Sequence, residues 1–132
     1  MGDALILETT FLIDLEREAA RKSPGAAHEF LERRPEHRLH ITPTVAGELA
    51  SGGSLADRAR WEDFVSPFHM LPLDRGVAWE YGKAFRYLQA NGLLIGANDL
   101  WIAAAGIAYR MPVVSRNARH YARVPDLDVL AY

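Results

Sequence analysis

Ala-Leu-Ile-Leu-Glu-Thr-Thr-Phe-Leu-Ile-Asp, residues 4–14, is the stretch that decides the fold of this chain. Its apolar run, residues 4–7, is too short for a core helix and lies between polar residues, which predicts a buried strand. The residues after it, with Phe11, Leu12 and Leu15 at helical spacing, predict a helix. A strand that passes directly into a helix is typical of an α/β fold.

The rest of the chain repeats this alternation of short apolar runs and longer helical stretches. Such a pattern predicts a parallel sheet of four or five strands joined by crossover helices. We expect strands at residues 4–7, 38–41, 68–71, 112–115 and 127–130. We expect helices from residue 10 to about 23, at 26–34, 43–51 and 55–65, from a cap at Asp74 to Ala90, and from a cap at Asn98 or Asp99 to Tyr109.

Length and composition bound the class of protein. The chain has 132 residues with 49% hydrophobic content, which predicts one domain over residues 1–132 with a sizeable core. It contains no apolar stretch of the roughly 18 residues that span a membrane, and we expect a soluble, cytoplasmic protein. It has no cysteine. Any metal must therefore be bound by oxygen or imidazole ligands.

The charge is nearly balanced, at −2, which argues against a broadly basic surface that binds nucleic acid without specificity. Thirteen of the fifteen basic residues are nevertheless Arg. Four of them gather around His120 late in the chain: Arg110, Arg116, Arg119 and Arg123. The planar donor fork of Arg matches phosphate geometry, so this segment is a candidate phosphate contact, with a solvated helix face as the alternative.

Four polar residues follow predicted strands or open predicted helices, where α/β sheets collect their ligands. Glu8 follows the first strand, Glu48 lies in the helix after the second, Asp99 opens a helix, and Asn117 follows the strand that ends near Val114. Carboxylates gathered at one point repel one another unless a cation neutralises them, and oxygen ligands suit Mg²⁺ or Mn²⁺. The pattern therefore predicts a divalent metal site able to activate water for hydrolysis of a phosphodiester.

Each of these residues has a simpler interpretation when taken alone. Asp99 would be a helix N-cap, Glu8 a turn residue and Glu48 an exposed helical residue. Asn117 would order a turn by bonding its own backbone. The remaining acids of the first helix, Asp14, Glu16 and Glu18, are expected to be surface charges paired with nearby basic residues of the same helix. The three Trp residues are expected in the core or at a dimer interface, with stacking on bases as the alternative.

At these positions the chain resembles the PIN-domain ribonucleases, and among them the VapC-type toxins of toxin–antitoxin pairs. The resemblance covers nearly the whole chain and is carried by the order and spacing of four segments: residues 5–14, 42–49, 98–104 and 114–117. It implies a three-layer α/β/α sandwich, Mg²⁺-dependent endoribonuclease activity, homodimerisation and inhibition by a cognate antitoxin.

Carried over residue by residue, the resemblance makes Glu8, Glu48 and Asp99 the metal ligands and adds Asn117 to them as a catalytic residue. Two positions depart from the family pattern. The first acid is usually Asp, and Glu8 reaches roughly 1.5 Å further. Asn117 takes a position that is often a fourth acid, and lacks its charge.

The expected substrate is RNA with an exposed, bendable backbone, which suits a compact acid cluster. Candidate substrate contacts are Thr10, Ser115, Arg116, Arg119 and His120. The departures at Glu8 and Asn117 leave a rival interpretation, a catalytically weakened PIN module that binds a protein or RNA partner. A phosphoacceptor receiver domain is a weaker rival, because it needs a Lys after a late strand and the two lysines, Lys22 and Lys83, lie in predicted helices.

Overall fold

The structure is a computed structural model, and it describes residues 3–132. Its centre is a five-stranded, fully parallel sheet with strand order β3-β2-β1-β4-β5. The predicted parallel sheet is therefore confirmed. The strands are β1 (Ala4–Leu7), β2 (Arg38–Ile41), β3 (His69–Met70), β4 (Val113–Val114) and β5 (Val129–Leu130).

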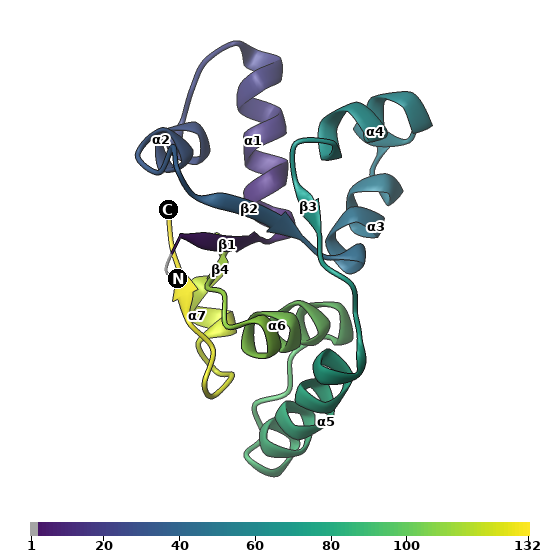
Figure 1. Ribbon diagram of the computed structural model, residues 1–132, viewed down its shortest axis with the longest axis vertical. Coiled ribbons are helices and arrows are strands. Elements are labelled where there is room, and N and C mark those ends of the chain that lie inside the picture. The colour runs from purple at the N-terminus through teal and green to yellow at the C-terminus, as the bar shows by residue number, and fades with distance from the viewer. Residues whose placement is uncertain (1–2) are drawn as a thin grey trace.

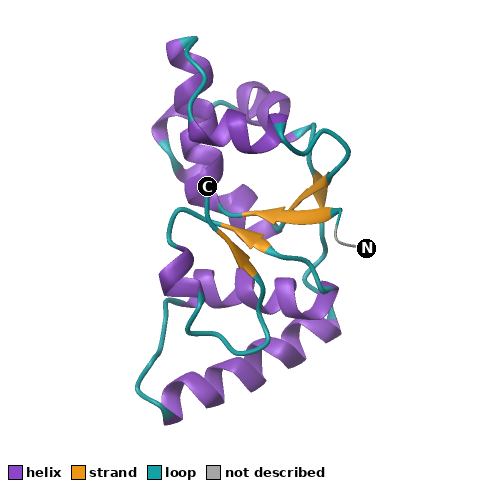
Figure 2. Ribbon diagram, turned by 90° about the vertical axis from the view of Figure 1, so that its left-hand side faces the viewer, coloured by secondary structure: helices purple, strands orange, loops and turns teal. Residues whose placement is uncertain are grey.

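Helices cover both faces of this sheet, as Figures 1 and 2 show. Four helices lie on one side: α1 (Thr9–Arg21), α2 (Ala26–Glu32), α3 (Pro43–Ser51) and α4 (Arg58–Val65), with the short 3-10 helix η1 (Gly53–Leu55) between the last two. On the other side, α5 (Arg75–Ala90) packs against α6 (Ala97–Tyr109), and the short α7 (Ala118–Tyr121) lies beside β5. The three-layer architecture is the one that the sequence resemblance implied.

Local sequence signals explain where several helices begin. Thr42 caps α3 by accepting a hydrogen bond from the backbone N–H of Val45, and a proline follows at the first helical position. Asp74 caps α5 in the same way, as predicted. The predicted cap of α6 is wrong, because Gly96 is its N-cap and makes no side-chain bond. Asn98 and Asp99 lie inside the first turn, which leaves their side chains free to make tertiary contacts.

The core lies on both sides of the central strands. Residues 5–7 of β1 are at most 1% exposed, and the alanine-rich run 102–105 of α6 is fully buried. Burial of one large aliphatic side chain stabilises the folded state by about 1.5–3 kcal/mol. The buried side chains of β1 therefore stabilise the packing of the helices against the sheet. Small residues let α6 approach the sheet closely. A Cβ atom at Gly106 would lie 2.7 Å from Leu127 and 2.9 Å from Val113.

The acids of α1 have tertiary partners instead of the predicted neighbours along the helix. Asp14 bonds the hydroxyl of Tyr132, and Glu16 accepts a bond from Ser54. Glu18 is only 5% exposed, so the prediction of a surface charge is wrong for it. Its carboxylate accepts bonds from the backbone N–H groups of Gly25, Ala27 and His28 and contacts the His28 ring. Glu18 thereby ties the end of α1 to the start of α2.

The tryptophans occupy three different environments. Trp61 is half-buried and donates a hydrogen bond to the carbonyl of Ala46, and Trp101 stacks on Tyr81 with ring centroids 4.1 Å apart. Trp79 is 63% exposed, so the expectation of a core position fails for it in this chain.

Across residues 3–132, no helix has both the length and the apolar composition needed to cross a membrane.

Candidate active site

The candidate site lies where the strand order of the parallel sheet reverses, between β1 and β4. Strands β1 and β4 are neighbours and end side by side, with Leu7 paired to Val114. From β1 the strand order continues to β2 and β3 on one side and to β4 and β5 on the other. Ligands of open α/β sheets bind in the crevice at such a switch point. Glu8 and Ser115 are the first residues after these two strands.

Glu8 is the N-cap of α1 and is 3% exposed. Its Oε2 accepts hydrogen bonds from the Thr10 backbone N–H at 3.0 Å, the Thr10 hydroxyl at 2.5 Å and the Ser115 hydroxyl at 2.9 Å. The helix N-terminus also stabilises a negative charge. One oxygen of Glu8 is therefore held firmly, and the other, Oε1, faces the hydroxyl of Tyr121 at 3.4 Å.

Asp99 lies in the first turn of α6, and both of its oxygens contact α7. Oδ1 accepts a bond from the Tyr121 hydroxyl at 3.1 Å, and Oδ2 lies 3.1 Å from Nε2 of His120. Because the carboxylate turns away from the helix end, its simpler interpretation as a cap does not apply. Asp99 instead joins α6 to the segment after β4.

Glu48 extends from α3 toward the other two acids. Its Oε1 accepts a bond from the Thr9 hydroxyl at 2.5 Å, and its Oε2 accepts one from the Asn98 side chain at 3.3 Å. Thr9 is the chain neighbour of Glu8, and Asn98 is the chain neighbour of Asp99. Glu48 is therefore bonded to the residue beside each of the other acids, which excludes its simpler interpretation as an ordinary exposed residue.

Tyr121 lies between Glu8 and Asp99, and no motif in the sequence marks it as a site residue. Its side chain is fully buried. Burial raises the pKa of the Tyr121 hydroxyl, and the charges of Glu8, Asp99 and Glu48 raise it further, so the phenol stays protonated as a donor. A signal that could have found it is its place directly after His120, among basic residues late in the chain.

Glu8 and Asp99 both contact the hydroxyl of Tyr121, and Glu48 bonds the chain neighbour of each, but the three acids do not close on one another. Among residues 3–132, no three His, Asp or Glu side chains already lie close enough to form a preformed cation site. The donor set nevertheless suits a hard divalent ion, because it consists of carboxylate oxygens from three separate elements. The hydrogen bonds that link Glu8 to Asp99 through Tyr121, and Glu48 to the neighbour of each, support this fit. Glu8, Glu48 and Asp99 are the residues that could hold the ion.

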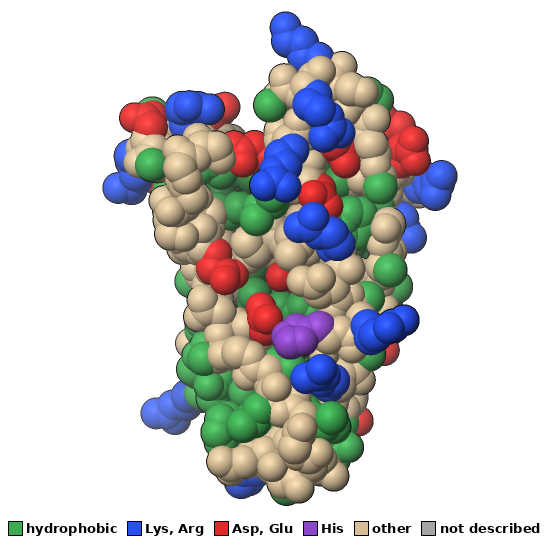
Figure 3. Space-filling view, turned by 180° about the vertical axis from the view of Figure 1, so that it is seen from behind, with side chains coloured by type: hydrophobic (Ala, Val, Ile, Leu, Met, Phe, Trp, Pro, Cys, Tyr) green, Lys and Arg blue, Asp and Glu red, His purple; other side chains and the backbone are tan. Residues whose placement is uncertain are grey.

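A basic hollow of about 340 Å³ adjoins the acids. It is lined by Arg116, Asn117, Arg119, His120 and Arg123. Asn117 is exposed and lines this hollow, and its backbone N–H donates to the Ser115 hydroxyl. The acids are bonded by other groups. Figure 3 shows acidic side chains and a histidine near the middle of one face, with Lys and Arg side chains around them.

Thr10 and Ser115 both bond the first acid. Ser115 is fully buried, so the expected contact of its side chain with a substrate is not supported. Its hydroxyl and that of Thr10 both donate to Glu8, and Thr10 also accepts a bond from the Arg116 backbone. These two residues fix the first acid. Arg116, Arg119 and His120 lie at the hollow, where a substrate could reach them.

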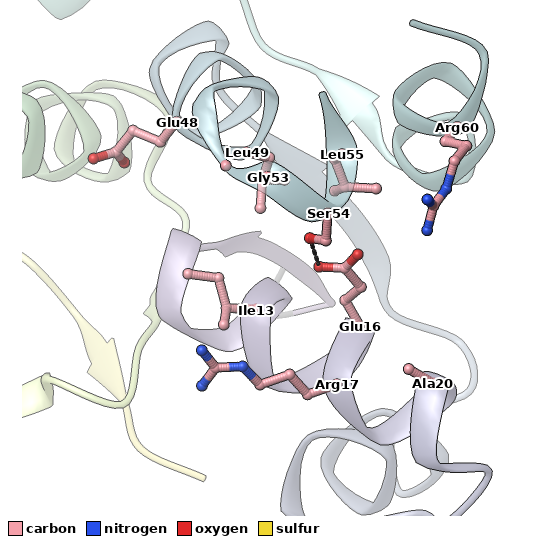
Figure 4. A pocket seen from close by; sticks show the side chains of 11 residues that line it. Ile13, Glu16, Arg17, Ala20, Glu48, Leu49, Gly53, Ser54, Leu55 and Arg60 are labelled. Carbon is pink, nitrogen blue, oxygen red and sulfur yellow. Dashed lines mark hydrogen bonds between the residues drawn. The ribbon is translucent and has the colours of Figure 1, made fainter. Parts of the chain in front are cut away.

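A groove of about 440 Å³ runs between α1, α3 and η1 and has Glu48 among its lining residues. In Figure 4, Ile13 and Leu49 line it as apolar side chains, and Glu16 bonds Ser54 across it. Of the three acids of the site, Glu48 lines this groove. The groove therefore offers a route by which another chain could reach Glu48.

The sequence matches the PIN domain family over residues 5–127. The chain is 30% identical to Ribonuclease VapC of Rickettsia bellii (strain RML369-C), over 96% of this chain and 94% of that protein. It is 28% identical to Ribonuclease VapC2 of Rickettsia felis, over 83% and 86% of the two chains. Its fold is similar to that in the crystal structure of VapBC2 from Rickettsia felis bound to a promoter DNA fragment, with a TM-score of 0.82, 24% identity and 98% coverage of both chains.

Proposed function

The chain belongs to the PIN-domain family of VapC ribonucleases, and from this membership and the geometry of its site we propose that it is a metal-dependent endoribonuclease. We further propose that residues 1–132 form a single PIN domain and act as the toxin of a type II toxin–antitoxin pair. The observation that carries the proposal is the meeting of Glu8 and Asp99 at the buried hydroxyl of Tyr121, with Glu48 bonded to the chain neighbour of each.

Glu8, Glu48 and Asp99 would hold the ion, with Mg²⁺ as the expected species and Mn²⁺ as an alternative. When bound, a divalent ion lowers the pKa of water and stabilises the charge that develops on a phosphodiester. The chain itself fixes the acids. Thr10 and Ser115 hold Glu8, while Thr9 and Asn98 hold Glu48. Preorganised ligands of this kind avoid the cost of reorganisation during the reaction.

The basic hollow supports RNA as the substrate. Arg119 and Arg123 are exposed and lie on the same short segment as His120, which contacts Asp99. Arg side chains bind phosphate with two parallel hydrogen bonds, so the hollow can receive the backbone of an RNA strand beside the acids. A single-stranded or looped region suits the site best, because its backbone can bend into a compact pocket.

An antitoxin partner is proposed on the likeness to the solved VapBC2 structure. The groove between α1 and α3 supports it, because a segment bound there would contact Glu48, one of the three acids. A neighbouring gene for a small protein with a DNA-binding N-terminus and an amphipathic C-terminal tail would support the toxin role.

Homodimerisation remains a proposal based on the family resemblance. Light scattering that shows a monomer would overturn the dimer.

The deciding experiment measures cleavage of single-stranded RNA by the purified chain. We expect cleavage with Mg²⁺, loss of cleavage with EDTA, and loss of cleavage in Asp99→Asn. Asp63→Asn is the matched control, because Asp63 is exposed on α4. Full activity in Asp99→Asn, or activity that EDTA leaves unchanged, would overturn the proposed function.

The rival function is binding without efficient cleavage, and one observation favours it. Three donors already bond Oε2 of Glu8, which is also the position that departs from the family pattern. Metal titration separates the two functions. Absence of Mg²⁺ and Mn²⁺ binding at millimolar concentration, together with a gain of cleavage in Glu8→Asp, would establish the binding role.

A further inference from the structure

Tyr121 bridges the first and third acids of the site. Its hydroxyl lies 3.1 Å from Oδ1 of Asp99 and 3.4 Å from Oε1 of Glu8, and its side chain is fully buried. The bridge joins residues that follow β1, open α6 and end α7. A buried phenol needs a polar partner, and here two charged oxygens from different elements supply it.

The two carboxylate oxygens of Glu8 have different hydrogen-bond partners. Oε2 is bonded by Thr10 and Ser115, whereas among the described residues Tyr121 is the donor recorded at Oε1. A Glu side chain has one more rotatable bond than Asp, and its carboxylate can swing. The single hydroxyl proton of Tyr121 is shared between Oδ1 of Asp99 and Oε1 of Glu8, and contacts at both oxygens of Glu8 restrict that motion. Tyr121 therefore fixes the direction of the oxygen that points into the site.

α7 fixes Asp99 in the same way. The backbone N–H of Tyr121 donates to the carbonyl of Asn117, and the carbonyl of Tyr121 accepts a bond from the backbone N–H of Val124, so the main chain of Tyr121 is held on both sides. His120, the preceding residue, takes the second oxygen of Asp99. One short helix therefore orients both oxygens of one acid and one oxygen of another.

We propose that Tyr121 is a positioning residue of the metal site, whose hydroxyl aims Oε1 of Glu8 and Oδ1 of Asp99 at a common point for a divalent cation. The inference rests on the proposed function. This role also explains how Glu8 works in place of the shorter Asp, because the Tyr121 hydroxyl keeps the longer side chain in one orientation. Donors behind metal ligands set their orientation and affinity in this manner.

The test is the affinity of the purified protein for Mn²⁺, measured by calorimetry without RNA. We expect Tyr121→Phe to bind Mn²⁺ about 10- to 100-fold more weakly than the wild type, the loss typical when a group behind a metal ligand is removed. Tyr109→Phe is the matched control, because its hydroxyl also bonds a carboxylate, that of Asp74, away from the acids. It should bind Mn²⁺ normally.

Unchanged or tighter binding by folded Tyr121→Phe would overturn the inference and leave the proposed function intact. Absence of Mn²⁺ binding by the wild type would overturn the proposed function itself. If Tyr121→Phe does not fold, the near-ultraviolet difference spectrum of the wild type provides the test. Saturation with Mn²⁺ should perturb a tyrosine band, in Tyr109→Phe as well as in the wild type, and a flat spectrum would count against the role of Tyr121.

A double-mutant cycle separates positioning from a general effect on structure. The side chain in Glu8→Asp is one methylene shorter and moves away from Tyr121, so half of the bridge is lost. We expect Tyr121→Phe to weaken Mn²⁺ binding less in the Glu8→Asp background than in the wild type. Equal losses in the two backgrounds would show that Tyr121 does not act through Glu8.

Discussion

The hydroxyl of Ser115 donates a hydrogen bond to Oε2 of Glu8 across 2.9 Å, although 107 residues separate the two in the chain. The bond joins the first residue after β4 to the first residue after β1. Both groups are buried, so neither can exchange its partner for bulk water without cost. The geometry of the first acid therefore depends on the pairing of two strands from opposite ends of the sequence.

Ser115→Ala should weaken Mn²⁺ binding about 10-fold or more, because Glu8 loses one of the donors that orient its carboxylate. Calorimetric titration of the folded variant measures the effect. Ser66→Ala is the control, since the Ser66 hydroxyl bonds a backbone carbonyl at an exposed position of the chain. The same affinity in Ser115→Ala and Ser66→Ala would contradict the supporting role of Ser115.

Glu18→Gln should destabilise the fold by about 2 kcal/mol, the range for hydrogen bonds to a charged group. An amide supplies one acceptor oxygen, whereas the carboxylate uses both of its oxygens to accept bonds from the start of α2. Urea unfolding at neutral pH measures the difference. Equal stability of variant and wild type would show that these bonds do not contribute.

The stability contributed by Glu18 should depend on pH. Burial alone would raise the pKa of its carboxyl group, but bonds from His28, Ala27 and Gly25 outweigh it and lower the pKa to about 2. Because the folded pKa lies below the ordinary value of 4.5, the contribution is present above pH 4.5 and is lost as the pH falls toward 2. Urea unfolding between pH 6 and pH 2.5 should show a steeper fall for the wild type than for Glu18→Gln.

Gly106→Ala should destabilise the protein by about 1–3 kcal/mol, because the new Cβ would overlap side chains of β4 and of the loop before β5. Gly82→Ala is the matched control in the middle of α5, where the nearest atom lies 3.7 Å away. That change should stabilise the protein by about 1 kcal/mol through helix propensity. Thermal unfolding of both variants tests the packing of α6, and similar shifts in Tm would refute it.

Removal of two arginines from the basic hollow should weaken RNA binding and reduce its dependence on salt. Each phosphate contact on a single strand contributes about 0.7 to the slope of log affinity against log salt. Arg119→Gln with Arg123→Gln should therefore lower the slope by about 1.4. Binding of single-stranded RNA to the Asp99→Asn protein gives the measurement. Arg58→Gln on α4, an exposed residue paired with Glu62, should leave the slope unchanged.

Local patterns in the sequence predicted the architecture well. The bounds of β1 and β2 agree with the predicted strands, and the cap at Asp74 is confirmed. The strands β3, β4 and β5 are shorter than predicted, with two residues each. The length of such a strand depends on how far its neighbours in the sheet pair with it. Apolar character along the sequence does not show where this pairing stops.

The sequence by itself determined the α/β order, the acids at element ends and the family to which their spacing belongs. Tertiary structure decided which donors meet those acids. Tyr121 and Ser115 reach Glu8 because β4 pairs beside β1 and α7 follows it, and Glu18 is buried because α2 begins over its carboxylate. The hydrophobic periodicity of a sequence indicates which face of a helix or strand is apolar. The meeting of side chains far apart in the chain depends on strand pairing and packing, which no local pattern contains.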